Sequence, residues 1–133
     1  MKKMNPVVHF EMPAKDMKRM SEFYQNVFGW KTQFLGEELG NYTVVSTTET
    51  DNNGRPKMAG AINGGFFPAD DNRPNLNPSI VIAVDNINEC IENIIEKGGA
   101  VVGPPTPIPG IGIYATFVDT EGNMVSILQP QME

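Results

Sequence analysis

The chain has 133 residues, of which 40% are hydrophobic and 20% are charged, the composition of one soluble globular domain with a real core. Its formal net charge of −6, without any basic stripe, excludes the usual kind of nucleic-acid-binding protein, because phosphates need cations to neutralise them. No apolar run approaches membrane-spanning length, and no apolar region typical of a signal peptide follows Lys2 and Lys3, so we expect a cytoplasmic protein with no membrane partner. The one cysteine, Cys90, excludes an internal disulfide.

The first predicted element is a strand over Val7–Met12. Alternation along a strand places His9 and Glu11 on one face and the apolar residues on the other, where they can pack on a helix. The polar pair must then face water, a cleft or a partner, because a buried unpaired carboxylate is costly. His9 is the only histidine in the chain, so this pair is the first candidate for a functional site.

A helix is predicted to begin after Asp16, which can cap it, and to run to Phe28 before Gly29. Its apolar stripe is typical of a core-facing helix and consists of Met17, Met20, Tyr24, Val27 and Phe28. Strands are expected over 30–35 and 41–47, around a turn at 36–40. The glycines of 58–66 suit a bulge or a close backbone approach, and a linker is expected over 67–77.

The second half begins with a β-branched strand over Ser79–Val84. Asn86 can cap a helix that extends to Lys97. A short strand is expected over 100–103, and the proline-rich segment Pro104–Gly112 is predicted to be a stiff loop without ladder potential. Strands over 113–119 and 124–129 follow, joined by a turn at 120–123.

The two halves repeat each other. A shift of 70 residues lays Asp16 on Asn86 and Gly29 on Gly99, and the order in each half is βαβββ. The sequence therefore predicts an α+β fold in a single domain, 1–133, with modules of about 5–66 and 78–131. Because neither module can bury its sheet face alone, the two sheets are expected to pair side by side into a curved cup, with the helices outside.

Strand parity predicts which side chains line the inner face of this cup. The lining is mostly apolar with a few polar groups, which fits a pocket for a small molecule, with Pro104–Gly112 at its rim. The predicted lining residues are His9, Glu11, Ser79, Val81, Ala83, Tyr114, Thr116, Met124, Ser126 and Leu128.

Four segments carry a family resemblance over nearly the whole chain: VHFEMP at 8–13, FYQNVFGW at 23–30, AINGGF at 61–66 and PGIGIYATFVDTEGN at 109–123. With the doubled βαβββ pattern, they resemble the vicinal oxygen chelate superfamily, which includes lactoylglutathione lyase (glyoxalase), extradiol dioxygenases, fosfomycin-resistance enzymes and bleomycin-resistance proteins. The chain looks like the glyoxalase-like branch related to lactoylglutathione lyase. Homodimers are common in this architecture, so a homodimer is one expected state.

In metal-using members, the resemblance implies ligands from the first and last strands of each half. His9 matches the first of these positions, whereas Ser79 and Ser126 stand where relatives often carry histidine and glutamate. The segment around Ala61–Asn63 offers no carboxylate or imidazole. A tightly held ion usually needs roughly three or four protein ligands. We therefore expect no cofactor, with a divalent metal on His9 as the alternative.

Three functions stay open. The one that the missing ligands favour is a binding module for a small organic molecule, with His9 and Glu11 as an acid–base pair in which the carboxylate orients the imidazole and favours its charged form. The alternative is a metal-dependent lyase, isomerase or dioxygenase of the glyoxalase type. The third is a domain whose partner is another protein, for which the sequence offers no exposed apolar helix stripe. His9 and Glu11 can also be hydrogen-bonded strand residues without a function, and whether the protein is an enzyme is left open.

Overall fold

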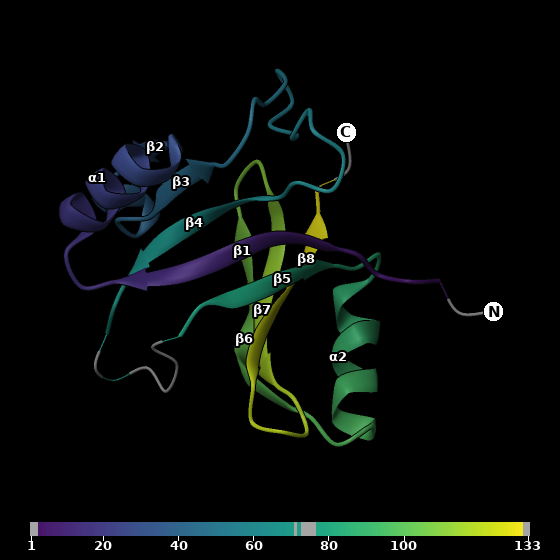
Figure 1. Cartoon of the computed structure of the whole chain (residues 1–133). Helices are drawn as coiled ribbons and strands as arrows, with labels where there is room; N and C mark the ends of the chain where they lie inside the picture. The colour runs from purple at the N-terminus through teal and green to yellow at the C-terminus, as the bar shows by residue number, and fades with distance from the viewer. Residues whose placement is uncertain (1–2, 71, 73–76, 132–133) are drawn as a thin grey trace. The chain divides into compact units, whose positions relative to one another are not determined.

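The computed structural model describes residues 3–70, 72 and 77–131. Its internal contacts divide the chain into two compact units, one made of residues 9–78 and the other of residues 1–8 with 79–133. Each unit contains one helix and one half of the strands (Figure 1). Most of the linker predicted over 67–77 cannot be compared with the structure, because residues 71 and 73–76 lie outside the described residues.

The N-terminal module has the order βαβββ. Its sheet has the strand order β2-β3-β4-β1, in which β1 and β4 are parallel and the other neighbours are antiparallel. The elements are β1 (Val7–Ala14), α1 (Met17–Phe28), β2 (Lys31–Phe34), a 3-10 turn (Glu37–Leu39), β3 (Thr43–Ser46) and β4 (Asn63–Pro68).

The C-terminal module repeats this order. Its strands run β5-β8-β7-β6, with β5 and β8 parallel and the other neighbours antiparallel. The elements are β5 (Ser79–Ala83), α2 (Ile87–Glu96), β6 (Ala100–Ile108), β7 (Gly112–Val118) and β8 (Met124–Pro130). The predicted α+β class with two βαβββ modules is confirmed, and the cup between the modules stays a prediction.

Local sequence signals set the start of both helices. The Asp16 carboxylate accepts a hydrogen bond from the backbone N–H of Arg19 at 3.0 Å, and the Asn86 side chain accepts one from Glu89 N–H at 3.1 Å. Each cap satisfies a helix N–H that has no partner within the helix. Gly29 follows α1 with a φ of 73°, the left-handed conformation that glycine adopts without a steric penalty. These end signals were predicted correctly.

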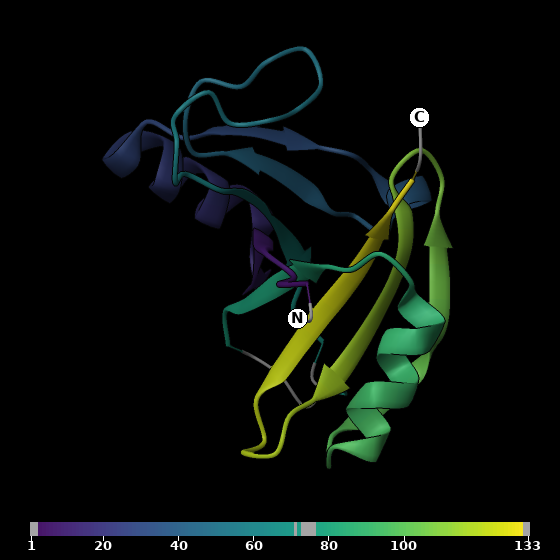
Figure 2. The same ribbon diagram turned by 90° about the vertical axis from the view of Figure 1, so that its right-hand side faces the viewer.

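Each helix packs on one face of its own sheet. In the N-terminal module, Ala14, Val45 and Phe66 are buried, and the helix residues Met17, Met20 and Tyr24 pack against them, together with Phe10, Met12 and Trp30. In the C-terminal module, α2 lies along its sheet (Figure 2), and the buried residues are Val84, Ile87, Ala115 and Ile127. Each sheet therefore has one face covered by its helix and one face turned away from it.

The apolar stripe of α1 is only partly in the core. Val27 and Phe28 are 55% and 59% exposed, and Phe23 beside them is 54% exposed. The prediction that the whole stripe is buried, and the expectation that no apolar helix stripe is exposed, are therefore wrong. The sheet does not cover these three apolar side chains on the last turns of α1. The periodicity of the sequence shows that a stripe is apolar but not how much of it the sheet covers.

The proline-rich segment is mostly strand, so the prediction of a loop over Pro104–Gly112 is wrong. After a register shift between Val102 and Thr106, β6 pairs with β7 again up to Ile108. Within its module β6 has only one neighbour, and proline is tolerated on such a strand because one of its sides forms no ladder and needs no N–H. Likewise Phe67 and Pro68, expected in the linker, end β4.

Candidate functional site

The candidate site of the N-terminal module starts on β1. Phe10 and Met12 pack in the core under α1, so His9 and Glu11 lie on the opposite face of the sheet, as the alternation predicts. The parallel register with β4 places Asn63 beside His9 and Gly65 beside Glu11.

The ring of His9 has a hydrogen-bonding partner from another segment of the chain, which alternation along β1 cannot predict. Its Nε2 lies 2.9 Å from the hydroxyl of Tyr42, which directly precedes β3. Tyr42 lies across Gly65, since a Cβ at that glycine would overlap the phenol ring and its hydroxyl. Tyr42 was not among the predicted site residues. Two signals in the sequence could have indicated it. Alternation along 42–46 puts residue 42 on one face with residues 44 and 46, and the glycine pair of β4 matches the expected close backbone approach.

Burial controls the protonation of this histidine. Removal of the imidazole from water lowers the pKa of His9 from its ordinary value of 6.5 to about 4. His9 is therefore neutral near pH 7, with one nitrogen as donor and the other as acceptor. A role for His9 and Glu11 as an acid–base pair stays a prediction, and the imidazole would enter it as a neutral base rather than in the charged form that Glu11 was expected to favour.

Asn63 fixes the loop next to His9. Its Oδ1 accepts a hydrogen bond from the backbone N–H of Thr47 at 2.9 Å, and its Nδ2 donates to the Thr50 hydroxyl at 3.0 Å. The Thr47 hydroxyl donates to the carbonyl of Ile62 at 2.6 Å. These bonds hold residues 47–50 to β4, so the surroundings of His9 are set by a braced loop as well as by the sheet.

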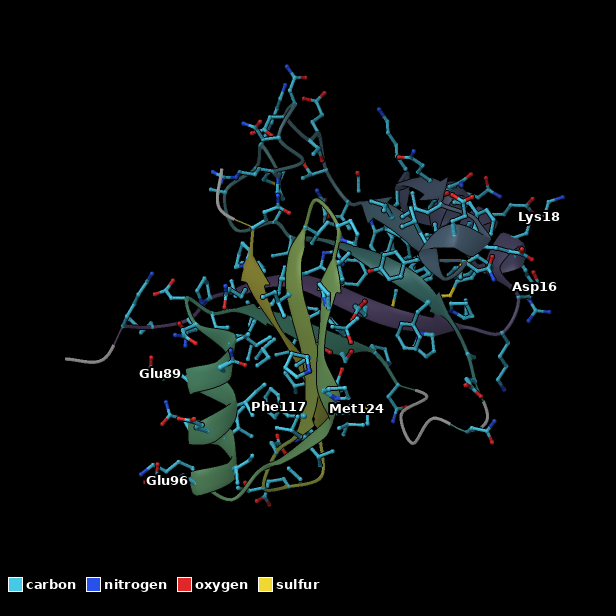
Figure 3. The ribbon with its side chains drawn as sticks, turned by 180° about the vertical axis from the view of Figure 1, so that it is seen from behind. Asp16, Lys18, Glu89, Glu96, Phe117 and Met124 are labelled. Carbon is cyan, nitrogen blue, oxygen red and sulfur yellow. The ribbon has the colours of Figure 1, made fainter. Side chains whose placement is uncertain are left out.

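The C-terminal module carries a cluster of hydroxyls on the sheet face away from α2. Ser126 Oγ lies 2.6 Å from Tyr114 Oη and 3.2 Å from Thr116 Oγ1, and Ser126 itself is buried. Figure 3 shows Phe117 on the α2 side of the sheet and Met124 on the other side. The side chain of Gln129, on the face opposite Ser126, accepts a hydrogen bond from Ile87 N–H at the start of α2.

The structure thus brings the C-terminal candidates together on one face. The β5–β8 register pairs Val81 with Ser126, and the β7–β8 register pairs Thr116 with Ser126 and Tyr114 with Leu128. Ser79 shares the face of Val81 because the two are two residues apart on β5. Their contact with a ligand stays a prediction.

The family follows from a comparison with known proteins. The model of the Glyoxalase/Bleomycin resistance protein/Dioxygenase superfamily matches residues 7–127. The chain belongs to this superfamily. A glyoxylase-like domain-containing protein of Didymella fabae is 27% identical over 124 residues, which cover 88% of each of the two proteins.

Solved structures of the glyoxalase fold are similar over nearly the whole chain. Methylmalonyl-CoA epimerase of Streptomyces coelicolor, in complex with 2-nitronate-propionyl-CoA, has a TM-score of 0.68 at 16% identity and covers 98% of this chain and 100% of its own. Methylmalonyl-CoA epimerase of Mycobacterium tuberculosis has a TM-score of 0.63 at 13% identity, with 95% and 88% covered. These likenesses show the fold.

Divalent metals occur in the glyoxalase superfamily, so the donor set of this member has to be compared with what an ion needs. The described residues, 3–70, 72 and 77–131, contain no group of three or more His, Cys, Asp or Glu side chains that could hold a metal. The Tyr42 hydroxyl lies 2.9 Å from His9 Nε2. A metal ion bound to this nitrogen at about 2.0–2.1 Å would have to displace that hydroxyl. Ser126 already has two hydroxyl partners. The side chains present do not fit a tightly held metal.

Among the described residues, neither helix is long and apolar enough to cross a membrane.

Proposed function

We propose that this glyoxalase-superfamily protein binds a small, uncharged, partly apolar organic molecule against His9 and Glu11 on the face of the N-terminal sheet away from α1, without a tightly bound metal. The observation that carries the proposal is the neutral His9 imidazole, held 2.9 Å from the Tyr42 hydroxyl on that face. Several hydrogen-bonding groups that converge on one sheet face, here His9, Asn63 and Tyr42, are typical of sites that orient small molecules.

Charge argues for an uncharged ligand. A neutral imidazole offers no positive charge to an anion, and Glu11 on the same face adds a carboxylate. The chain as a whole carries a formal charge of −6. A phosphate or carboxylate group that approaches His9 would therefore gain no charge attraction from the ring, and the negative net charge of the chain disfavours such a ligand.

The first test is a ligand screen by thermal unfolding, with uncharged aromatic and hydroxycarbonyl compounds as probes. A ligand at 100 times its Kd should raise the free energy of unfolding by about 2.7 kcal/mol in the wild type. The shift should shrink in His9→Ala and in Glu11→Gln, and it should be kept in Asn26→Ala, an exposed residue of α1, which covers the other face of the sheet. Hits that stabilise the wild type and His9→Ala equally would place the ligand elsewhere and overturn the proposal.

The neighbouring epimerase structures supply a second probe. One of them is in complex with methylmalonyl-CoA and NH4+. Because that thioester carries several phosphate charges, we expect it to give no shift with this chain. A shift that disappears in His9→Ala would instead support an acyl-CoA ligand and a glyoxalase-type enzyme.

Metal content is the second prediction. Protein purified without a histidine tag should hold far less than one equivalent of zinc, nickel, iron or manganese by elemental analysis, because the described part of the chain places no group of three or more His, Cys, Asp or Glu side chains around His9. His9→Ala serves as the control, since it removes the single imidazole. Near-stoichiometric metal in the wild type that is lost in this variant would favour the metal-dependent lyase, isomerase or dioxygenase.

A further inference from the structure

The two modules carry a tyrosine at the same register position. Val44 on β3 lies opposite Gly65 on β4, and Thr116 on β7 lies opposite Ser126 on β8. Tyr42 and Tyr114 each stand two residues before these strand positions. Gly65 is thereby the counterpart of Ser126, and Tyr42 is the counterpart of Tyr114.

The hydroxyls of these two tyrosines find different partners. Tyr114 Oη lies 2.6 Å from the hydroxyl of Ser126, which projects from the last strand of its module. Gly65 has no side chain to offer, and the Tyr42 phenol fills the space above it, where its hydroxyl lies 2.9 Å from His9 Nε2. The glycine is what allows the tyrosine of this module to reach the first strand.

We propose that Tyr42 is the positioning residue of the His9 site and that Gly65 leaves the space for its ring. The ligand of this site rests on the proposed function, whereas the geometry of Tyr42 and His9 does not. A phenol is a better proton donor than a neutral imidazole, and the imidazole nitrogen is the better acceptor. Tyr42 therefore donates to Nε2 and holds the ring in the tautomer that carries its proton on Nδ1. A ligand that reaches the other nitrogen has to bring an acceptor, such as a carbonyl or ether oxygen.

The single histidine makes this testable without knowing the ligand. Protein labelled with 15N-histidine gives one pair of ring nitrogen signals, those of His9. At pH 7.5 the wild type should show the Nδ1–H tautomer. Tyr42→Phe, which removes only the hydroxyl, should shift both signals toward a mixture of tautomers. Gly65→Ala should do the same, because its methyl group takes the place of the phenol.

Gly64→Ala is the matched control for the second variant. It adds the same methyl group to the neighbouring residue of β4, but on the core side, where it meets the ring of Phe10 rather than Tyr42. It should lower stability and leave the His9 signals of the folded protein unchanged. Unchanged signals in Tyr42→Phe, or equal shifts in Gly64→Ala and Gly65→Ala, would overturn the proposal.

The ligand screen separates this inference from the proposed function. If the ring signals respond as expected and no uncharged probe binds, Tyr42 positions His9 and the ligand proposal fails. If probes bind through His9 while Tyr42→Phe leaves the ring signals unchanged, the ligand proposal stands and the role of Tyr42 fails.

Discussion

Replacing Phe66 by alanine is expected to lower the free energy of unfolding by about 3–5 kcal/mol. The Phe66 side chain is fully buried in one core with Ala14 and Val45, and its ring lies 5.5 Å from that of Tyr24 on α1. Truncation removes a large apolar group and leaves a cavity that the rigid sheet cannot close. Urea unfolding followed by tryptophan fluorescence of Trp30, the only tryptophan in the chain, measures the loss.

Phe67→Ala is the matched control, because the same side chain is removed from the next residue of β4, which is only half-buried. Its cost should be clearly smaller. Equal losses in the two variants would mean that the core of the N-terminal module is not organised around Phe66. Since β4 also carries Gly65, this core holds in place the glycine over which the Tyr42 ring lies.

Lowering the pH from about 7.5 to about 5 is expected to reduce the free energy of unfolding by about 2 kcal/mol through His9 alone. The pKa of His9 is about 4 in the folded protein and 6.5 ordinarily. Between these values the unfolded chain binds a proton that the folded protein does not. Stability is therefore highest above pH 6.5, falls as the pH drops through it, and has lost its full His9 contribution below pH 4.

His9→Gln should remove this dependence, because glutamine does not titrate. The carboxyls of Asp51 and Asp119 have lowered pKa values from hydrogen bonds to neighbouring backbone and side-chain groups. Their contribution is lost only as the pH falls through still more acidic values, so it does not overlap the window used. An unchanged pH slope in His9→Gln, measured by urea unfolding at each pH, would show that His9 is not buried as a neutral group.

The sequence by itself determined what depends on neighbours along the chain. Asp16 and Asn86 cap their helices through N–H groups three residues away, and Gly29 ends α1 because its φ of 73° suits a residue without a Cβ. The repeat of these signals in both halves was enough to predict two βαβββ modules. Alternation along β1 was likewise enough to separate His9 and Glu11 from the core, since a strand has a period of two.

Only the tertiary structure decided what depends on residues far apart. Tyr42 meets His9 from 33 positions away because β3 and β1 are both neighbours of β4, and because Gly65 between them lacks a side chain. The prolines of β6 are tolerated because strand order leaves β6 at the end of its module's sheet. The pKa of His9 is lowered because folding removes its ring from water. Local propensity carries none of this information, since each effect needs a partner that the fold brings close.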